Sequence, residues 1–366
     1  MNTRRHLLAN TLILCAALCA AATASAQPYI AYEYGATAGA VSQVSIANLK
    51  ANWVVTGIRN GSGNLQVISW YSNGTKLVRK GSATAGAISS VSTAGLGSNQ
   101  FVTAVINGSG NLELISWSVS SSGAIAREGD FESVAAQKVD IARLSASRAV
   151  TAIQDSFGNL TLNVWAVDSS GNITAKGSVT DGAVSKVSVA GMSGSQLVTA
   201  VETASGDLLV SSWSVNSNGA ITHQDDASAG AITQVDVTAW ADLGHLGTAV
   251  IESSGKLEVI DWIADPTTGA ITRQASYTLT GTASKVAVTT NGTLIFTIVK
   301  DGAGKLNVGV WGYDTSNQFD RAANYEYDPA TIVAGAPLST GSYSVTASKN
   351  SAGDLELNVW MYGVQY

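Results

Sequence analysis

One phrase of sequence recurs along this chain to its end, and it constrains the fold more than any other feature. In the copy at residues 102–117, Val-Thr-Ala-Val-Ile-Asn is followed by Gly-Ser-Gly and then by Asn-Leu-Glu-Leu-Ile-Ser-Trp. Two apolar segments joined by such a turn predict a β-hairpin. The closing tryptophans recur at spacings of 47 to 49 residues: Trp70, Trp117, Trp165, Trp213, Trp262, Trp311 and Trp360. This regularity predicts an array built from copies of one supersecondary unit.

Each repeat divides into four short apolar segments. In the second repeat these are residues 88–96, 101–106, 112–117 and 124–128, and turn-forming residues separate them. Four antiparallel strands in a repeat of this length are typical of one blade of a β-propeller. The sequence therefore predicts an all-β propeller of seven blades.

The two ends of the chain complement each other. The last repeat ends at residues 360–366 without a fourth segment, whereas residues 28–34 precede a stretch, 35–40, that mirrors residues 81–87. We therefore expect the N-terminal strand to complete the last blade and remove an open sheet edge. An open solenoid is the alternative, but complementary ends favour a closed ring within one domain, residues 27–366.

On period, strand pattern and closing strand, the whole chain after residue 26 resembles the seven-bladed β-propellers as a class. It lacks the WD40 signature dipeptides and the Ser-x-Asp-x-Gly-x-Thr-Trp box of sialidases. The loops at residues 59–64 and 300–305 are superficially similar to calcium-binding repeats of integrin-type propellers. They lack alternating Asp and Asn ligands, so we expect glycine-rich turns there. We predict no metal and no cofactor.

Residues 1–26 have the composition of a cleavable signal peptide. Arg4 and Arg5 precede an apolar stretch, residues 7–22, and an Ala-Ser-Ala site ends at Ala26. The general secretory route is the plainer interpretation, although the twin arginines also fit export after folding. We therefore predict a secreted or periplasmic protein, with no membrane insertion of the mature chain. Both cysteines lie inside this leader, so we expect no disulfide.

The charge balance argues against polyanionic partners. The chain has 20 Lys and Arg against 26 Asp and Glu, for a formal net charge of −6. Nucleic acid and anionic membrane surfaces call for the opposite sign. The partners we expect are a carbohydrate or extracellular polymer, or an envelope protein.

Two recurring residue types invite a structural interpretation. The seven tryptophans end apolar strands at constant register, so we interpret them as core rather than as sugar-stacking platforms. Counting back across the turns places a basic residue opposite the tryptophan in five repeats and alanine in the other two. Cation–π pairing is the favoured role, and a ring of basic sites for an anionic polysaccharide is the alternative. The residues are Arg79, Arg127, Ala175, His223, Arg273, Arg321 and Ala31.

Two sets of residues are candidates for function. Asp140 and Asp236 take an inner-strand position that holds Ser or Ala in other repeats, where a general acid and base could act. Their blades are not adjacent, so we expect a separation too long for a coupled pair and favour a role in the channel lining. Tyrosines beside acidic residues near the closing seam form the predicted ligand-binding patch, since such surfaces suit neutral sugars. These are Tyr32, Tyr34, Tyr277, Tyr325 and Tyr327.

The function favoured by these features is non-catalytic, lectin-like carbohydrate binding outside the cytoplasm. A protein-interaction scaffold is the first alternative, with the irregular loop at residues 328–337 as its contact region. A polysaccharide lyase or glycosidase working through Asp140 and Asp236 is the second. The sequence has no H-E-x-x-H, G-x-S-x-G or phosphate-binding loop, which counts against an enzyme.

Overall fold

The fold consists of β-strands joined by short turns. The computed structural model describes residues 27–97, 99–240, 244–314, 316–338 and 342–365. The predicted signal peptide, residues 1–26, lies outside the described residues. Within the described ranges, no helix is long and apolar enough to cross a membrane.

The strands follow one another in a repeating order of one long strand and two short ones. The long strands are β1 (Gln27–Lys50), β4 (Leu77–Gly95), β7 (Ile125–Ser145), β10 (Ile173–Ser193), β13 (Ile221–Ala239), β16 (Ile271–Thr290) and β19 (Phe319–Leu338). The first short strands are β2 (Trp53–Asn60), β5 (Gln100–Asn107), β8 (Arg148–Asp155), β11 (Gln196–Thr203), β14 (His245–Glu252), β17 (Ile295–Asp301) and β20 (Tyr343–Asn350). The second short strands are β3 (Asn64–Ser72), β6 (Asn111–Val119), β9 (Asn159–Val167), β12 (Asp207–Val215), β15 (Lys256–Ala264), β18 (Lys305–Tyr313) and β21 (Asp354–Gln365).

Each long strand belongs to two neighbouring sheets. The first part of β4 pairs with β3 as far as Ala87, and from Ile88 onward the same strand pairs with β5. The prediction of separate short strands, such as one over residues 124–128, is therefore wrong. The outer strand of one sheet and the inner strand of the next are a single extended segment, as in β7.

A backbone hydrogen bond forms at each point where a long strand passes from one sheet to the next, and the chain passes there without a turn. The N–H of the first inner-strand residue donates to the carbonyl of a glycine in the preceding hairpin turn, at 2.7 to 3.0 Å. These glycines have φ between 81° and 91°, a conformation that other residues rarely adopt. This requirement accounts for the recurring Gly of the turn phrase. The pairs are Ile88–Gly63, Ala136–Gly110, Val184–Gly158, Ile232–Gly206, Ala283–Gly255, Ala330–Gly304 and Val41–Gly353.

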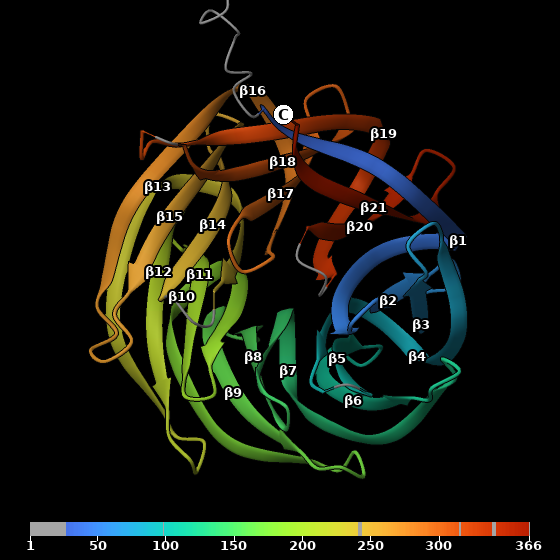
Figure 1. The fold of residues 1–366 in the computed structure, drawn as a ribbon. Helices are drawn as coiled ribbons and strands as arrows, with labels where there is room; N and C mark the ends of the chain where they lie inside the picture. The colour runs from blue at the N-terminus through green and yellow to red at the C-terminus, as the bar shows by residue number, and fades with distance from the viewer. Residues whose placement is uncertain (1–26, 98, 241–243, 315, 339–341, 366) are drawn as a thin grey trace, which may run out of the picture.

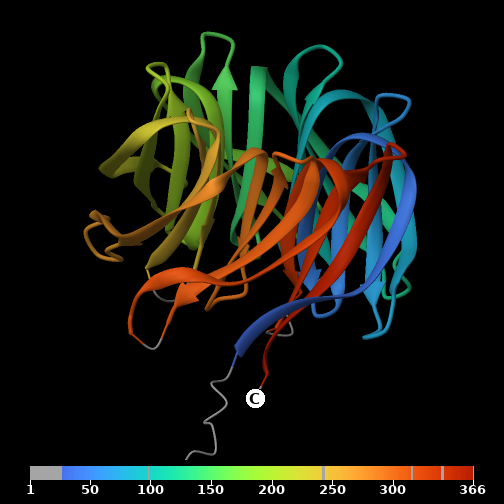
Figure 2. The same ribbon diagram turned by 90° about the horizontal axis from the view of Figure 1, so that it is seen from above.

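The sheets are arranged in a ring around a central opening (Figure 1), and the ring is closed by the two ends of the chain. The start of β1 lies along β21 (Figure 2), and the two strands pair antiparallel from Gln27 opposite Gln365 to Ala40 opposite Asp354. This is the pairing that the complementary ends predict. An all-β, antiparallel and closed arrangement of this kind is a β-propeller.

The core lies between neighbouring sheets and is centred on the repeated tryptophans. Each is 1% exposed or less. Each indole Nε1 donates to the Oγ1 of the threonine 14 residues earlier, at 2.8 to 3.1 Å. The interpretation of these residues as core is confirmed, and their burial excludes them as sugar-stacking platforms. The threonines are Thr56, Thr103, Thr151, Thr199, Thr248, Thr297 and Thr346.

The five basic residues do lie opposite their tryptophans, but the predicted cation–π pairing holds for one of them in the described part of the chain. The Arg273 guanidinium lies 5.9 Å from the Trp262 ring. Arg127 forms ion pairs with Glu113 and Asp130, and Arg273 combines its ring contact with an ion pair to Glu258. The register pairs are Trp70–Arg79, Trp117–Arg127, Trp213–His223, Trp262–Arg273 and Trp311–Arg321.

The placement of Ala31 in this series is wrong by one residue. Tyr32 is the residue opposite Trp360, and Ala31 lies opposite Met361. The aromatic ring of Tyr32 thus takes the position that a basic side chain has in other sheets.

Replacing Thr151 with valine tests the indole hydrogen bond. The substitution keeps the shape and β-branching but leaves the buried Trp165 N–H without its acceptor. We expect a loss of about 1–3 kcal/mol in the free energy of unfolding, measured by urea denaturation. Thr222→Val, an exposed change on β13, is the matched control and should stay near wild type. Equal stability of both variants would contradict a structural role for the bond.

Candidate functional site

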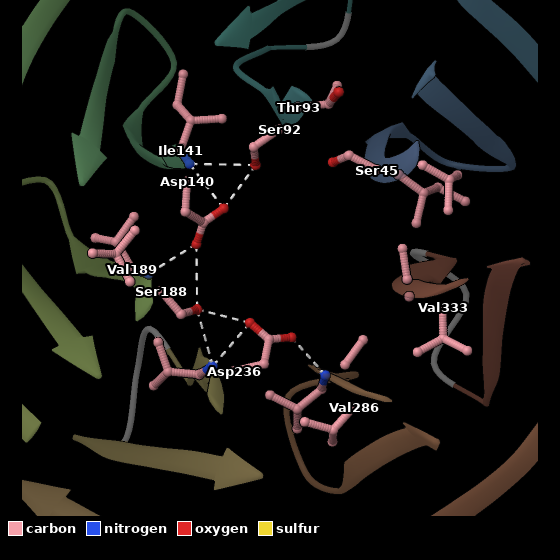
Figure 3. A pocket seen from close by; sticks show the side chains of 18 of the residues that line it. Ser45, Ser92, Thr93, Asp140, Ile141, Ser188, Val189, Asp236, Val286 and Val333 are labelled. Carbon is pink, nitrogen blue, oxygen red and sulfur yellow. Dashed lines mark hydrogen bonds between the residues drawn. The ribbon is translucent and has the colours of Figure 1, made fainter. Parts of the chain in front are cut away.

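The channel at the centre of the ring is the first candidate site. The inner segments of the long strands line a hollow of about 360 Å³ (Figure 3). Each inner segment contributes one residue at the same register position, and the polar ones gather along one arc. These residues are Ser45, Ser92, Asp140, Ser188, Asp236, Ala287 and Ala334.

The two predicted acids are coupled through the serine between them. The Ser188 hydroxyl lies 2.7 Å from Asp236 Oδ1 and 3.3 Å from Asp140 Oδ2. Ser92 donates to Asp140 Oδ1 at 2.7 Å (Figure 3). The expectation that the carboxylates are too far apart for coupling is therefore wrong. The side chains bend toward the sheet that separates them, and a single hydroxyl bridges the gap.

Backbone donors occupy the carboxyl oxygens as well. Val189 N–H donates to Asp140 Oδ2 at 2.9 Å, and Val288 N–H donates to Asp236 Oδ2 at 2.7 Å. In both cases the donor belongs to the next sheet around the ring. The carboxyls therefore tie neighbouring sheets together, as Ser188 does by accepting from Val237 N–H at 3.2 Å.

This environment shifts the ionisation of both acids in the same direction. Burial, followed by the charge of Asp140, raises the pKa of Asp236 to about 7. Burial also raises the pKa of Asp140, although donors from Ser92, Val189, Ile141 and Ser188 oppose it. A proton held near neutral pH is chemically suited to acid–base work. Since both carboxyls are already filled with intramolecular donors, however, the geometry favours their structural role.

The second candidate is an aromatic cluster where the ends of the chain meet, which we call the seam cluster: Tyr32, Tyr325, Tyr327 and Trp360. Tyr32 stacks on Tyr327 with ring centroids 5.2 Å apart. All three tyrosines contact Trp360, at 5.4 to 5.8 Å. Tyr32 and Tyr325 are each 37% exposed, so part of the cluster faces solvent.

Two of the predicted tyrosines lie outside the seam cluster. Tyr277 packs against Trp311 at 5.8 Å, and within the described residues it makes no ring contact with the cluster. The Tyr34 hydroxyl is 2.6 Å from Ser72 Oγ, in a separate hollow of about 270 Å³.

Residues 31–34 and 324–328 lie at different register positions in their sheets. Tyr32 lies opposite the tryptophan of its own sheet, Trp360. Tyr325 lies opposite Val308, three residues before Trp311, and Tyr277 takes the corresponding place opposite Val259.

Acidic groups surround the seam cluster. Burial, the nearby hydroxyl of Tyr32 and the charge of Glu356 raise the pKa of Tyr327. Burial and the charge of Asp328 raise the pKa of Glu356 itself. Glu33 is exposed beside Tyr32. Aromatic faces next to carboxylates offer both stacking surfaces and hydrogen-bond acceptors.

A third site was missed in the sequence. Asp261, His245 and Tyr313 meet at a hollow of about 210 Å³ between β15 and β18. One signal was available: Asp261 precedes Trp262 where Ser69, Ser116 and Ser212 precede their tryptophans. Among the described residues, no group of three or more His, Cys, Asp or Glu side chains is placed to hold a metal ion.

Comparison with known proteins supports the fold. Neither a protein-family model nor a curated protein sequence matches the chain. The WD40 domain of coronin from Toxoplasma gondii is similar with a TM-score of 0.63 at 12% identity, covering 93% of this chain and 87% of that one. A protein from Lactobacillus plantarum is similar with a TM-score of 0.57 at 13% identity, covering 80% and 90%. At these identities the likeness concerns the fold alone.

Asp236→Asn tests the protonation of the channel pair. The folded-state pKa of about 7 exceeds the 3.8 of a free aspartate, so the folded protein holds a proton that the unfolded chain releases. Wild-type stability should therefore fall as the pH rises from about 4 to 7. Asparagine cannot titrate, so the variant should gain about 1–3 kcal/mol on wild type at pH 8 relative to pH 5, measured by urea denaturation.

The control for this test is Asp181→Asn, which removes an exposed carboxylate on β10. Its stability should follow that of wild type across the same pH range. Parallel profiles for Asp236→Asn and wild type would contradict a proton held in the channel.

Proposed function

We propose that this protein is an exported, non-catalytic carbohydrate-binding protein, and that its sugar site is the seam cluster. The observation that carries the proposal is the gathering of Tyr32, Tyr325 and Tyr327 around Trp360, with two of the tyrosines partly exposed. Ring faces stack on the C–H groups of a sugar, and phenol hydroxyls and acids bind its hydroxyls. The extracellular polymers that we expect as partners offer such groups in repeated form.

The rigidity of the cluster supports this role. Trp360 is fully buried and anchored to Thr346 at 2.9 Å, so the tyrosines lie on a fixed base. Tyr32 comes from β1 and Tyr325 and Tyr327 from β19, two strands held by separate sheets. A surface built in this way pays little ordering entropy when a ligand binds.

We further infer a ring of seven blades with four strands each, over residues 27–366. The support is the pairing order, in which the inner part of a long strand, two short strands and the outer part of the next long strand follow one another. Export to the periplasm or beyond rests on the leader-like composition of residues 1–26.

Tyr325→Ala should lower glycan binding by about tenfold, because it removes one stacking face from the cluster. Tyr277→Ala is a matched control: it removes the same residue from the same register position, where the ring covers Trp311 instead of Trp360. Both variants lose one contact with a buried tryptophan, so their stabilities should be similar. Binding to a glycan and polysaccharide array, followed by titration of the best ligand, measures the difference.

Three results would count against the proposal. Equal loss of glycan binding in both variants would place the site elsewhere. Silence of the wild-type protein across the array, together with specific capture of an envelope protein, would favour an interaction scaffold instead. A hydrolysed or cleaved polysaccharide would point to an enzyme.

A further inference from the structure

The hollow between β15 and β18 is a departure from the repeat. In three other sheets the residue before the tryptophan is a serine whose hydroxyl donates to a turn glycine carbonyl of the next sheet, at 2.6 Å. The pairs are Ser69–Gly123, Ser116–Gly171 and Ser212–Gly269. At the corresponding place in β15 stands Asp261, and the group that reaches it from the next sheet is the hydroxyl of Tyr313 at 2.6 Å.

The Asp261 side chain is buried and is not neutralised by a lysine or arginine. It is 2% exposed, and in the described ranges its one ion-pairing partner is His245 Nδ1 at 3.1 Å. Burial, together with the Asp261 carboxylate, raises the pKa of Tyr313, so the phenol keeps its proton and donates it to the carboxylate. A buried carboxylate with so few donors retains attraction for a positive charge.

The other polar side chains around the hollow have partners within the protein. Since a carboxylate accepts, His245 Nδ1 donates to Asp261 Oδ1 at 3.1 Å. The Tyr313 proton is committed to Asp261. Thr293 Oγ1 donates to Asn291 Oδ1 at 3.2 Å. The proton-bearing groups Nδ1 of His245, the hydroxyl of Tyr313 and the hydroxyl of Thr293 are thus bonded to acceptors within the protein, and Asp261 is the acidic side chain that lines the hollow.

Aromatic rings form the walls. Tyr313 and Phe319 lie 5.5 Å apart at 58°, and Phe319 stacks on Trp311 at 6.3 Å. On the other side Trp240 meets the edge of His245 at 5.9 Å. Tyr313 is 44% exposed, so this wall reaches solvent. Aromatic faces carry negative electrostatic potential and attract cations.

From this arrangement we propose that the hollow binds an organic cation, an ammonium head group held between Tyr313, Phe319 and Trp240 above the Asp261 carboxylate. The charge complementarity comes from the buried Asp261 carboxylate and from the aromatic walls. The volume of about 210 Å³ suits a small head group rather than a drug-sized ligand, whose pockets span about 300–1,000 Å³. The site is separate from the seam cluster and does not depend on the sugar proposal.

The test compares choline with 3,3-dimethylbutan-1-ol, which has the same shape but no charge. Saturation-transfer NMR of the methyl signals, titrated against the purified protein, measures binding of each. Choline should bind, and the neutral alcohol should bind at least about tenfold more weakly. An Nα-acetyl-lysine amide is titrated in parallel. Tighter binding of choline supports a quaternary head group as the ligand, and tighter binding of the amide supports a peptide side chain.

Substitutions in the hollow test whether choline binds there. Asp261→Asn removes the charge at nearly constant shape and should weaken choline binding by about tenfold. Asp226→Asn is the matched control, because Asp226 also pairs with a histidine, His223 at 2.8 Å, but on an exposed surface. Tyr313→Leu removes an exposed wall of the hollow and provides a second test if Asp261→Asn fails to fold. It should weaken choline binding as well.

Three results would overturn the proposal: no saturation transfer to choline or the lysine amide, equal binding of choline and the neutral alcohol, or unchanged choline binding by Tyr313→Leu. Glycan binding should be the same in the Asp261 and Tyr313 variants as in wild type. This readout keeps a failure of the cation site distinct from a failure of the sugar site.

Discussion

The architecture depends on one backbone hydrogen bond at every passage from sheet to sheet. The carbonyl of a left-handed glycine in each hairpin turn accepts the N–H of the residue that begins the next inner segment, as Gly110 does for Ala136. The strand can then leave one sheet and enter the next without bending back. One continuous strand thus joins each pair of neighbouring sheets, and the hydrogen bond keeps the two sheets at a fixed spacing. The buried tryptophans fill that spacing, and each indole N–H finds its threonine because the register of the hairpin is constant.

The acidic residues of the channel and of the hollow at Asp261 occupy fixed register positions of the repeat. Asp140 and Asp236 stand where serines stand in neighbouring sheets, and they keep the serine's task of accepting a backbone N–H from the next sheet. The longer carboxyl adds a second acceptor and a charge. Burial makes that charge costly, which is why the pKa of Asp236 rises. Asp261 also replaces a serine, at the position before the tryptophan. The serines there donate to a glycine carbonyl of the next sheet, whereas Asp261 accepts from the Tyr313 hydroxyl of the next sheet.

The periodic features of the fold could be predicted from the sequence. Features that depend on contacts between residues far apart in the chain could not. The tryptophan core and the pairing of the two ends followed from the repeat alone. The continuous strands were missed because the crossing residues, such as those at 83–87, are small and carry no helix or strand signature of their own. Residue counting placed the five basic residues correctly although a bulge lies next to each of them, and it misplaced Ala31 because no turn in the sequence joins β1 to β21. The bridge through Ser188 and the hollow at Asp261 unite residues about 50 positions apart, so no local pattern reveals them.

The same logic explains why the seam gathers tyrosines without disturbing the fold. One outer-strand position lies opposite the residue that comes three before the tryptophan of its own sheet. The side chain at this position packs on the tryptophan of the next sheet. Phe131 covers Trp165 there, and Tyr277 and Tyr325 cover Trp311 and Trp360. A hydroxyl at the outer edge of such a ring leaves the packing unchanged, so this position is free to acquire polar chemistry. At Trp360 the ring closure adds Tyr32 in the register position that is basic in five other sheets. This tryptophan is therefore covered by tyrosines from two strands, and the surface above it differs from the rest of the ring although the core beneath it does not.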